Sequence, residues 1–403
     1  MIPKFVRAKF VGVKQPLGRW ILRHVVEFAI LSPAILFTWL WLKAWRKEVL
    51  LVGVASSSIT AFLMPLEVEL RRRVDIKSDL SQLIVLDLSP DANSQIRKMY
   101  DSVAKIYGEE AKLLRRIIWW ASALGRLQLP RREILEIHED SMWHTGQPLV
   151  SLTAAEIEVG NKFLESIGVG KNQPIVCYAT RSSSYYEKLS ASGVQLKSRN
   201  VRNPDESIYF EVSKYLSEQG AFVIRLGKNL DTKVPNSYQE YIFDYASEFR
   251  TEFLDVFLVQ RCNLFISGGT GLVIMRAIAN LPTINSDFYR IHKGWFKKDL
   301  ALFQKVYYIH KNRFATVSEK VAMKSQFSDE RHQERLGVRL IKNTVEEILA
   351  ACDEMTARLN GTWVTTDEDE ILQKKYWDLI CDSGHHGGRI GAQFLRDNQD
   401  LLR

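Results

Sequence analysis

The sequences FVIRLG (residues 222–227) and NLFISGGTGLVIMRAIAN (residues 263–280) decide the fold class of this chain. They contain two short apolar runs, Phe222–Leu226 and Asn263–Ser267, each followed by glycine, which predict two buried strands. The second run continues through a glycine-rich loop into a helical pattern. A strand, a glycine loop and a helix in this order are typical of a parallel α/β sheet.

The loop after the second strand is the first candidate ligand site. Glycine lets the backbone approach a ligand closely, and the N–H groups at a helix start attract anions. In open α/β sheets, ligands bind at junctions of this kind. A tight turn that only packs the helix against the sheet is the alternative. The candidate contacts are Ser267, Gly268, Gly269, Thr270 and Gly271.

Strands and helices alternate along the rest of the chain, which predicts two successive α/β domains. The other predicted strands are Glu48–Val52, Leu83–Leu88, Pro174–Ala179 and Val306–Ile309. A capping box of Thr153 with Glu156 starts one helix, which runs to Ile167. The other predicted helices are Ile59–Arg73, Ala92–Ile106, Ala111–Leu127, Asp205–Gln219, Leu272–Asn280, Val345–Leu359 and Ile371–Leu379.

Positive charge is concentrated at the N-terminus of the 403-residue chain. Residues 1–50 carry nine Lys and Arg against two Glu, which is +7 of a total net charge of +8. A nucleic-acid-binding protein usually carries its positive stripe on the folded body. Here the charge flanks an apolar segment, so an anionic membrane surface is the predicted partner of residues 1–47, and nucleic acid is not expected.

That apolar segment is Phe28–Leu42, fifteen residues without a charge. A membrane-spanning helix needs about 20 apolar residues, and Pro33 and Glu27 weaken this one. A secretory signal fits badly because Lys43 and Arg46 lie where small residues would be cleaved. We therefore expect an interfacial helix with its tryptophans at the headgroup level. A buried hydrophobic helix of the fold is the alternative.

Three other motifs favour structural roles. Asp367-Glu368-Asp369 has the spacing of a metal motif, but no strand precedes it, so it reads as the acidic start of a helix. Glu346 and Glu354 are predicted to lie on a solvated helix face. The cysteines are far apart and form no CxxC motif, so free thiols in a reducing compartment are expected at Cys177, Cys262, Cys352 and Cys381.

Several segments resemble a bacterial family of GT-B-fold glycosyltransferases that is distantly similar to the nodulation-type fucosyltransferases. Their order and spacing carry the resemblance across most of residues 150–403. Two departures stand out: Ile59–Phe62 replaces an Ile-Gly-His-Leu-like step, and Ser182 replaces the acid after a loop arginine. The resembling segments are Leu152–Gly168, Ile175–Tyr186, Arg199-Asn200, Val223–Gly227, Phe265–Gly271, Asn343–Trp363 and Ile390–Leu401.

The resemblance implies a GT-B-like α/β fold with two Rossmann-like domains that face a cleft. The expected organisation has four parts: a basic, hydrophobic membrane-interface helix (1–46), an acceptor domain (47–150), a nucleotide-sugar domain (151–360) and a helical tail (361–403) that crosses back to the first domain.

The donor site is expected to use arginines and the glycine loop. Arginine forks and backbone N–H groups stabilise a departing diphosphate without a metal. Arg181, at a strand end, is the first candidate; a surface ion pair is its alternative. Arg225, with Gly227 after it, is the second, and a buried structural role is its alternative. Tyr245 is a candidate for stacking on the base or ribose, against packing in the core.

A general base would deprotonate the acceptor hydroxyl. The candidates His138, Asp140 and His144 cluster in the predicted interdomain stretch, where solvated loop residues are the alternative. Asp87 ends a strand of the first domain and is a further option. No metal and no cofactor are expected, with the nucleotide sugar acting as a substrate.

The predicted function is sugar transfer from a nucleotide-sugar donor to a glycan acceptor in bacterial surface polysaccharide biosynthesis. Lipid-linked glycans are among the acceptors considered. The predicted location is the cytoplasmic face of the inner membrane. Two alternatives stay open: another transferase on the same scaffold, for pyruvyl or phosphate groups, or a non-catalytic, membrane-associated assembly factor on a degenerate fold.

Overall fold

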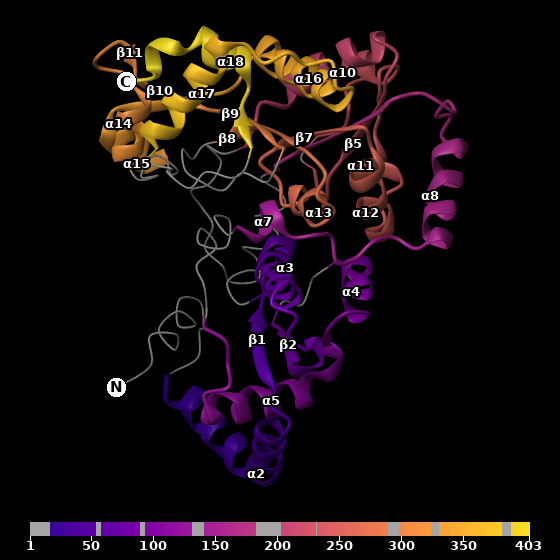
Figure 1. The fold of residues 1–403 in the computed structure, drawn as a ribbon, viewed down its shortest axis with the longest axis vertical. Helices are drawn as coiled ribbons and strands as arrows, with labels where there is room; N and C mark the ends of the chain where they lie inside the picture. The colour runs from indigo at the N-terminus through magenta and orange to yellow at the C-terminus, as the bar shows by residue number, and fades with distance from the viewer. Residues whose placement is uncertain are drawn as a thin grey trace. The chain divides into compact units, whose positions relative to one another are not determined.

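The structure is a computed structural model that describes residues 17–53, 58–88, 93–130, 141–182, 203–230, 232–288, 298–323, 330–380 and 388–403. The chain divides into two compact units (Figure 1). The described residues up to 130 form the first unit, and those from 141 onward form the second. The α/β class and the presence of a parallel sheet in each unit are confirmed. The predicted domain limits stay predictions.

The first unit is built on a three-stranded parallel sheet with the order β1-β2-β3. The apolar runs EVLLV and LIVLD form β1 (Glu48–Val52) and β2 (Leu83–Asp87), both largely buried. The predicted helix Ala92–Ile106 is wrong at its end, where Lys105–Tyr107 pairs with β2 as β3. The helices of this unit are α2 (Leu17–Ala44), α3 (Ile59–Asp75), α4 (Ser94–Asp101) and α5 (Lys112–Gly125).

Helix α2 contains the predicted apolar segment and packs along α5. Ile35 and Leu42 are buried against Ile118 and Ala121 in a core that also includes Val49 of β1. Pro33 lies inside the helix and does not end it. The apolar stretch Val25–Ala44 is 20 residues long, and by length and composition alone it could cross a membrane. This stretch is therefore longer than the fifteen residues read from the sequence.

The second unit contains a seven-stranded parallel sheet with the order β13-β9-β8-β7-β4-β5-β6. The chain enters at β4 in the middle, continues to β5 and β6 on one side, and returns to β7 on the other side of β4. The strands are β4 (Ile175–Thr180), β5 (Phe222–Leu226), β6 (Ile242–Phe243), β7 (Leu264–Gly268), β8 (Ile284–Phe288), β9 (Leu300–Phe303) and β13 (Arg389–Ile390).

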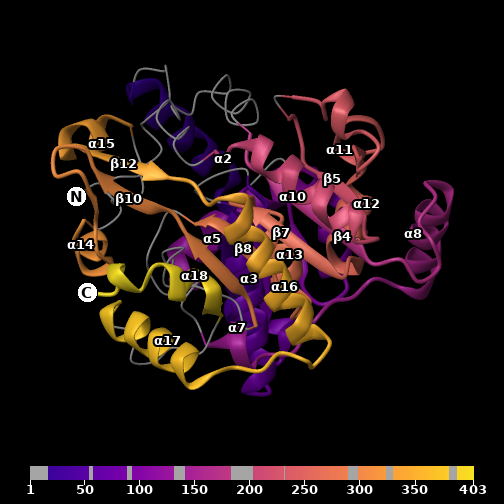
Figure 2. The same ribbon diagram turned by 90° about the horizontal axis from the view of Figure 1, so that it is seen from above.

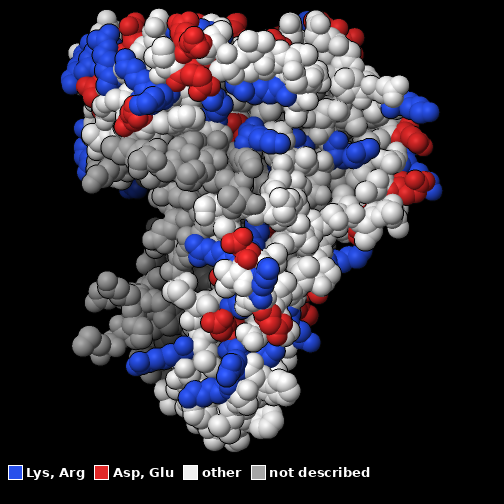
Figure 3. Space-filling view, viewed as in Figure 1, with Lys and Arg blue, Asp and Glu red and all other residues white. Residues whose placement is uncertain are grey.

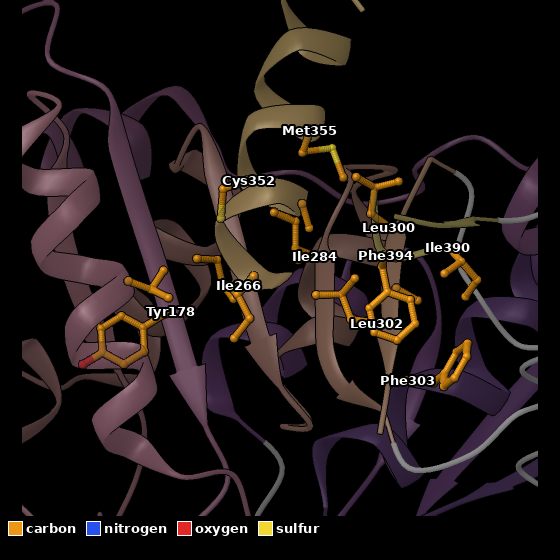
Figure 4. Packing of buried hydrophobic residues seen from close by; sticks show 14 of the residues in the cluster. Tyr178, Ile266, Ile284, Leu300, Leu302, Phe303, Cys352, Met355, Ile390 and Phe394 are labelled. Carbon is orange, nitrogen blue, oxygen red and sulfur yellow. The ribbon is translucent and has the colours of Figure 1, made fainter. Parts of the chain in front are cut away.

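Helices cover the sheet of the second unit (Figures 1 and 2). One face packs against α10 (Glu206–Glu218) and α16 (Val345–Leu359), whose buried side chains meet those of β4, β7 and β8. Figure 4 shows this core, with Cys352 and Met355 of α16 above Ile266 and Ile284. Two further helices of the unit, α12 (Glu252–Arg261) and α13 (Val273–Ile278), pack against each other.

The tail also belongs to this unit. Helix α17 (Asp367–Leu379) and helix α18 (Ala392–Asp397) pack on each other, and β13 extends the sheet beside β9. Helix α17 begins four residues before the predicted start at Ile371, because Thr366 and Asp369 form a capping box. A crossing of the tail to the first unit stays a prediction.

A second sheet and several further helices complete the second unit. A second sheet, with the order β11-β10-β12, is antiparallel and consists of β10 (Lys305–Tyr308), β11 (Arg313–Phe314) and β12 (Val338–Ile341). The capping box predicted at Thr153 is confirmed at the start of α8. The other helices are α7 (Met142–Thr145), α8 (Ala154–Ser166), α11 (Tyr245–Glu248), α14 (Val317–Ala322) and α15 (Glu330–Leu336).

Candidate functional site

The strand order creates a switch point between β4 and β7. These strands are parallel neighbours, and the chain leaves them toward opposite edges of the sheet. Ligands of open α/β sheets bind outside the carboxyl ends of strands at such a point. In the register of the pair, Ala179 lies beside Ser267 and Thr180 beside Gly268. Arg181 and the glycine loop therefore start from the same edge of the sheet.

Position 268 has no room for a side chain, because two groups lie against the backbone of Gly268. A Cβ at this position would lie 2.8 Å from the Tyr209 hydroxyl oxygen and 3.1 Å from Cγ of Pro204. The next residue, Gly269, has φ +78°, which L-residues with a side chain rarely adopt. Its own Cβ position has no atom within 4 Å. The loop thus has one packed glycine followed by an open one.

The rest of the loop is also open at its tip. Gly269 and Gly271 are exposed, whereas Ser267 is buried and its carbonyl accepts a hydrogen bond from the Ser286 hydroxyl at 3.4 Å. The Thr270 hydroxyl is buried and has no hydrogen-bond partner among the described residues. A buried hydroxyl without a partner costs free energy, and a bound polar ligand would supply that partner.

Two cationic side chains at this edge of the sheet donate hydrogen bonds to the same residue, Asn203. Arg181 donates from Nε to the Asn203 side-chain oxygen at 3.1 Å, and Lys342 donates from Nζ to the Asn203 carbonyl at 2.5 Å. Both cations are half-buried. Pro204, next in the chain, is the residue that presses on Gly268. Asn203 and Pro204 therefore bring the two cations to the start of the glycine loop.

Lys342 is a candidate site residue that sequence reasoning missed. It follows β12 directly and precedes the Thr344 cap of α16. No local pattern distinguishes it from other lysines, and residue 342 is brought to residue 203 only by the fold. Burial lowers its pKa, while the nearby carboxylates of Asp287 and Asp205 act in the opposite direction.

Asp287 holds the segment that carries Lys342. Its backbone N–H donates to the Asn343 side-chain oxygen at 2.7 Å, and its carboxylate accepts from the Asn343 backbone N–H at 2.9 Å. The Tyr209 hydroxyl donates to the same carboxylate at 3.2 Å. The residue adopts φ +54°, and burial raises the pKa of its carboxyl. This reciprocal pair joins β8 to the start of α16.

Arg225 lies in a buried ionic cluster below the edge. Its guanidinium donates to Glu206 at 2.6 Å and to Asp244 at 3.2 Å. The Thr180 hydroxyl also donates to Glu206, at 3.1 Å. Gly227, which follows β5, is buried, and a Cβ there would lie 2.6 Å from Leu230. These contacts favour the structural alternative for Arg225 over a direct donor contact.

Tyr245 is fully buried, and its hydroxyl donates to the Thr251 carbonyl at 2.9 Å and to the Asp255 carboxylate at 3.0 Å. Its ring packs edge-on to Phe163. This placement favours core packing over stacking on a base. Asp255 also accepts from Arg250 at 2.6 Å, and burial raises its pKa to about 6.

The predicted base candidates lie in or near a part of the chain that is only partly described. His138 and Asp140 lie outside the described residues. His144 belongs to α7, although its side chain is not among those described. Asn280, after α13, donates to the Gly146 carbonyl at 2.9 Å, so α7 is fastened to the segment that begins at the glycine loop. In the first unit, Asp87 is buried, and its carboxylate lies 3.7 Å from Arg97.

The acidic motifs have structural roles. Glu354 is not solvated as predicted; it is 2% exposed, pairs with Arg358 at 2.7 Å and accepts from the Ala392 backbone N–H at 2.6 Å. Asp369 completes the capping box of α17 with Thr366 and pairs with Arg396. Of the cysteines, Cys177, Cys262 and Cys352 are buried free thiols, and Cys381 lies outside the described residues.

Comparisons with known proteins give only remote likenesses. No protein-family model and no curated protein matches the chain. One similar solved structure is the E. coli ADP-heptose LPS heptosyltransferase II, with 12% identity and a TM-score of 0.42 over 63% of this chain and 90% of that one. Another is a family 9 glycosyltransferase of Veillonella parvula DSM 2008, with 12% identity and a TM-score of 0.32 over 72% and 78%. At these values they assign neither a family nor an activity, and the resemblance to nodulation-type fucosyltransferases stays a prediction.

Proposed function

We propose that the protein is a glycosyltransferase that binds a nucleotide-sugar donor at the β4–β7 edge of its second unit. One observation carries this proposal: Arg181 and Lys342 converge on Asn203, and the next residue, Pro204, lies against Gly268 at the switch point of a parallel sheet. Two of the segments that resemble a glycosyltransferase family, Ile175–Tyr186 and Phe265–Gly271, contain Arg181 and this glycine loop.

The proposed chemistry depends on stabilising a departing diphosphate. When the bond from the sugar to the nucleotide breaks, negative charge grows on the diphosphate oxygens. Arg181 and Lys342 would neutralise part of that charge, and the backbone N–H groups of the glycine loop would bind it at close range. The Thr270 hydroxyl offers one further donor at the loop. In this proposal the reaction needs no metal or cofactor.

The acceptor hydroxyl must lose its proton during transfer. We propose that one of three residues, His144, Asp140 or His138, acts as the general base. Of these, His144 belongs to α7, which Asn280 fastens to the segment that follows the loop. A base acting from this stretch would take the proton directly or through one water molecule.

The acceptor and location follow from the basic N-terminus. We propose a glycan acceptor, lipid-linked glycans included, in bacterial surface polysaccharide assembly at the cytoplasmic face of the inner membrane. The excess of Lys and Arg in residues 1–50 and the apolar stretch of α2 support this location. The donor's sugar and base are left to experiment.

A panel of nucleotides and nucleotide sugars tests this function by thermal shift, because a ligand that binds the native state raises its stability. We expect one base family to raise the melting temperature. We then expect release of the nucleoside diphosphate from the matching sugar when glycan acceptors are added. Binding without turnover would favour the non-catalytic assembly factor. No binding by any nucleotide would favour the non-catalytic assembly factor, or pyruvyl or phosphate transfer on the same scaffold.

A further inference from the structure

We infer that the exposed face of α2 docks the protein onto an anionic lipid bilayer, with the helix lying in the plane of the interface rather than crossing the membrane. This inference goes beyond the proposed sugar transfer and would stand if the donor were not a nucleotide sugar. It names the surface, the chemistry of its partner and the orientation of the helix.

One face of α2 is fixed to the folded body of the first unit. Phe28, Leu31, Ile35, Trp39 and Leu42 recur at intervals of three and four residues and pack against α5 and the sheet. The Phe28 ring meets Trp120 edge-on at 5.2 Å between centroids. Glu27, on the same helix, forms an ion pair with Arg116 of α5. The contact therefore runs over several turns of α2.

The opposite side of α2 is apolar and exposed. Ile30 and Phe37 are each 72% exposed and belong to a set of exposed apolar side chains on one helix face. Between Phe28 and Leu42 the helix carries no charge. Figure 3 shows mostly white atoms at the lower tip of the view, where α2 lies, with Lys and Arg groups beside them. The other large apolar side chains on this face are Val25, Val26, Leu36, Leu40 and Trp41, with Trp45 just beyond the helix.

The packing on α5 argues against a spanning helix. If α2 crossed the bilayer, α5 would enter the hydrocarbon with it, since the two helices are in contact along their lengths. Helix α5 carries Lys112, Arg115 and Arg116 and covers the sheet of the unit. Burying such charges in lipid costs several kcal/mol each, roughly 2.5–3.5 on insertion scales. An in-plane position buries only the exposed face and leaves α5 in water.

The charges at the end of the helix select an anionic partner. Lys43, Arg46 and Lys47 follow the apolar stretch, and the Lys43 ammonium lies over the Trp39 ring at 4.7 Å. Arg19 and Arg23 precede the stretch in the sequence. Glu27, the sole acid of α2, is already paired with Arg116. Apolar side chains flanked by cations are the chemistry of an interfacial helix on anionic lipid.

Vesicle co-sedimentation of the full-length protein tests the docking. We compare wild type with the double variant Ile30→Glu/Phe37→Glu, using phosphatidylcholine vesicles with and without phosphatidylglycerol. The control, Val364→Glu/Ile371→Glu, changes two apolar residues of the second unit that are 79% and 65% exposed. We expect the α2 variant to lose at least about tenfold in partitioning, because two apolar contacts become charges, and the control to bind as wild type does.

Three readouts keep the result decisive. Phosphatidylglycerol should strengthen binding of wild type, and Lys43→Gln/Lys47→Gln should remove that gain. Melting temperatures should match between the α2 variant and its control, and nucleotide binding should persist in both, which separates failure of docking from failure of the donor site. Equal partitioning of all variants would overturn the inference. A wild-type dimer that Ile30→Glu/Phe37→Glu converts to monomer, without lipid binding, would do so too.

Discussion

At the scale of single residues, the open glycine of the candidate site has a matched control elsewhere in the chain. Gly269 has φ +78° and Gly361 has φ +72°, and neither has an atom within 4 Å of the place where a Cβ would stand. Alanine at either position should cost about 1–2 kcal/mol of unfolding free energy from backbone strain. Only Gly269→Ala should also weaken nucleotide binding, because its methyl group would occupy the approach to the loop.

Chemical denaturation and nucleotide titration of the two variants check this prediction together. Comparable losses of stability with a selective loss of affinity in Gly269→Ala would support a ligand at the loop. Wild-type affinity in both variants would mean that the Gly269–Gly271 tip is only a turn.

The buried carboxyl of Asp255 makes stability depend on pH. Burial raises its pKa from the ordinary 3.8 to about 6, so the folded protein holds this proton more tightly than the unfolded chain does. The contribution of this group to the free energy of unfolding is therefore fully present below about pH 4. It falls by roughly 3 kcal/mol as the pH rises through 6. Denaturation at several pH values should show this decline.

Asp255→Asn provides the control for the pH effect, since an amide does not titrate. The free energy of unfolding of this variant should lack the decline between pH 4 and 6 that wild type shows. A parallel decline in both proteins would assign the effect to other groups. Both proteins keep Arg250, the residue that pairs with Asp255 at 2.6 Å in wild type.

At the scale of elements, the Asp287–Asn343 pair fixes how β8 meets α16. Asn343→Ala removes the acceptor of the Asp287 backbone N–H, a group that is buried. We expect a loss of about 1–3 kcal/mol of unfolding free energy, because a buried donor is left without a partner. We also expect weaker nucleotide binding, because Lys342 precedes Asn343 directly and would lose its fixed position.

Asn360→Ala, at the other end of α16, is the comparison for this variant. Asn360 is exposed and follows the last helical residue. Its replacement should leave both stability and nucleotide affinity close to those of wild type. If Asn343→Ala loses stability but keeps full affinity, the pair supports the fold without positioning Lys342.

The same elements show where sequence reasoning succeeds and where it stops. The apolar run of β1 and the capped helix α16 match their predicted limits, because local pattern and capping residues determine both. No strand is predicted at β8, INSDF, because the polar residues Ser286 and Asp287 give no apolar run, although both are buried and bonded to Tyr209. Their burial depends on α10, 77 residues away in sequence, which no local pattern records.

The candidate site follows the same division. Arg181 and the loop Ser267–Gly271 were predicted because both follow strands, and parallel strands end at one edge. Lys342 reaches that edge from a different sheet, through Asn203, so only the fold reveals it. Arg225 resembled a site residue from its strand, but its partners Glu206 and Asp244 come from α10 and the start of α11. The structural role of Arg225 is therefore recognisable only when the fold shows which two carboxylates surround it.

At the scale of the whole molecule, the two proposals lie on separate units. The apolar face of α2 belongs to the first unit, and the β4–β7 edge belongs to the second. Each unit has its own parallel sheet and its own core. Variants of one surface should therefore leave the other intact. Lipid binding and nucleotide binding can thus be tested independently.

The most direct test of the account is the affinity of Arg181→Ala and Lys342→Ala for the nucleotide sugar that the panel identifies, measured by titration calorimetry. Arg261→Ala, an exposed arginine of α12, is the matched control. Losing a charged hydrogen bond to a diphosphate should weaken binding by about 10- to 100-fold in each site variant, while the control binds as wild type does. Unchanged affinity in both site variants would contradict a donor site at the β4–β7 edge.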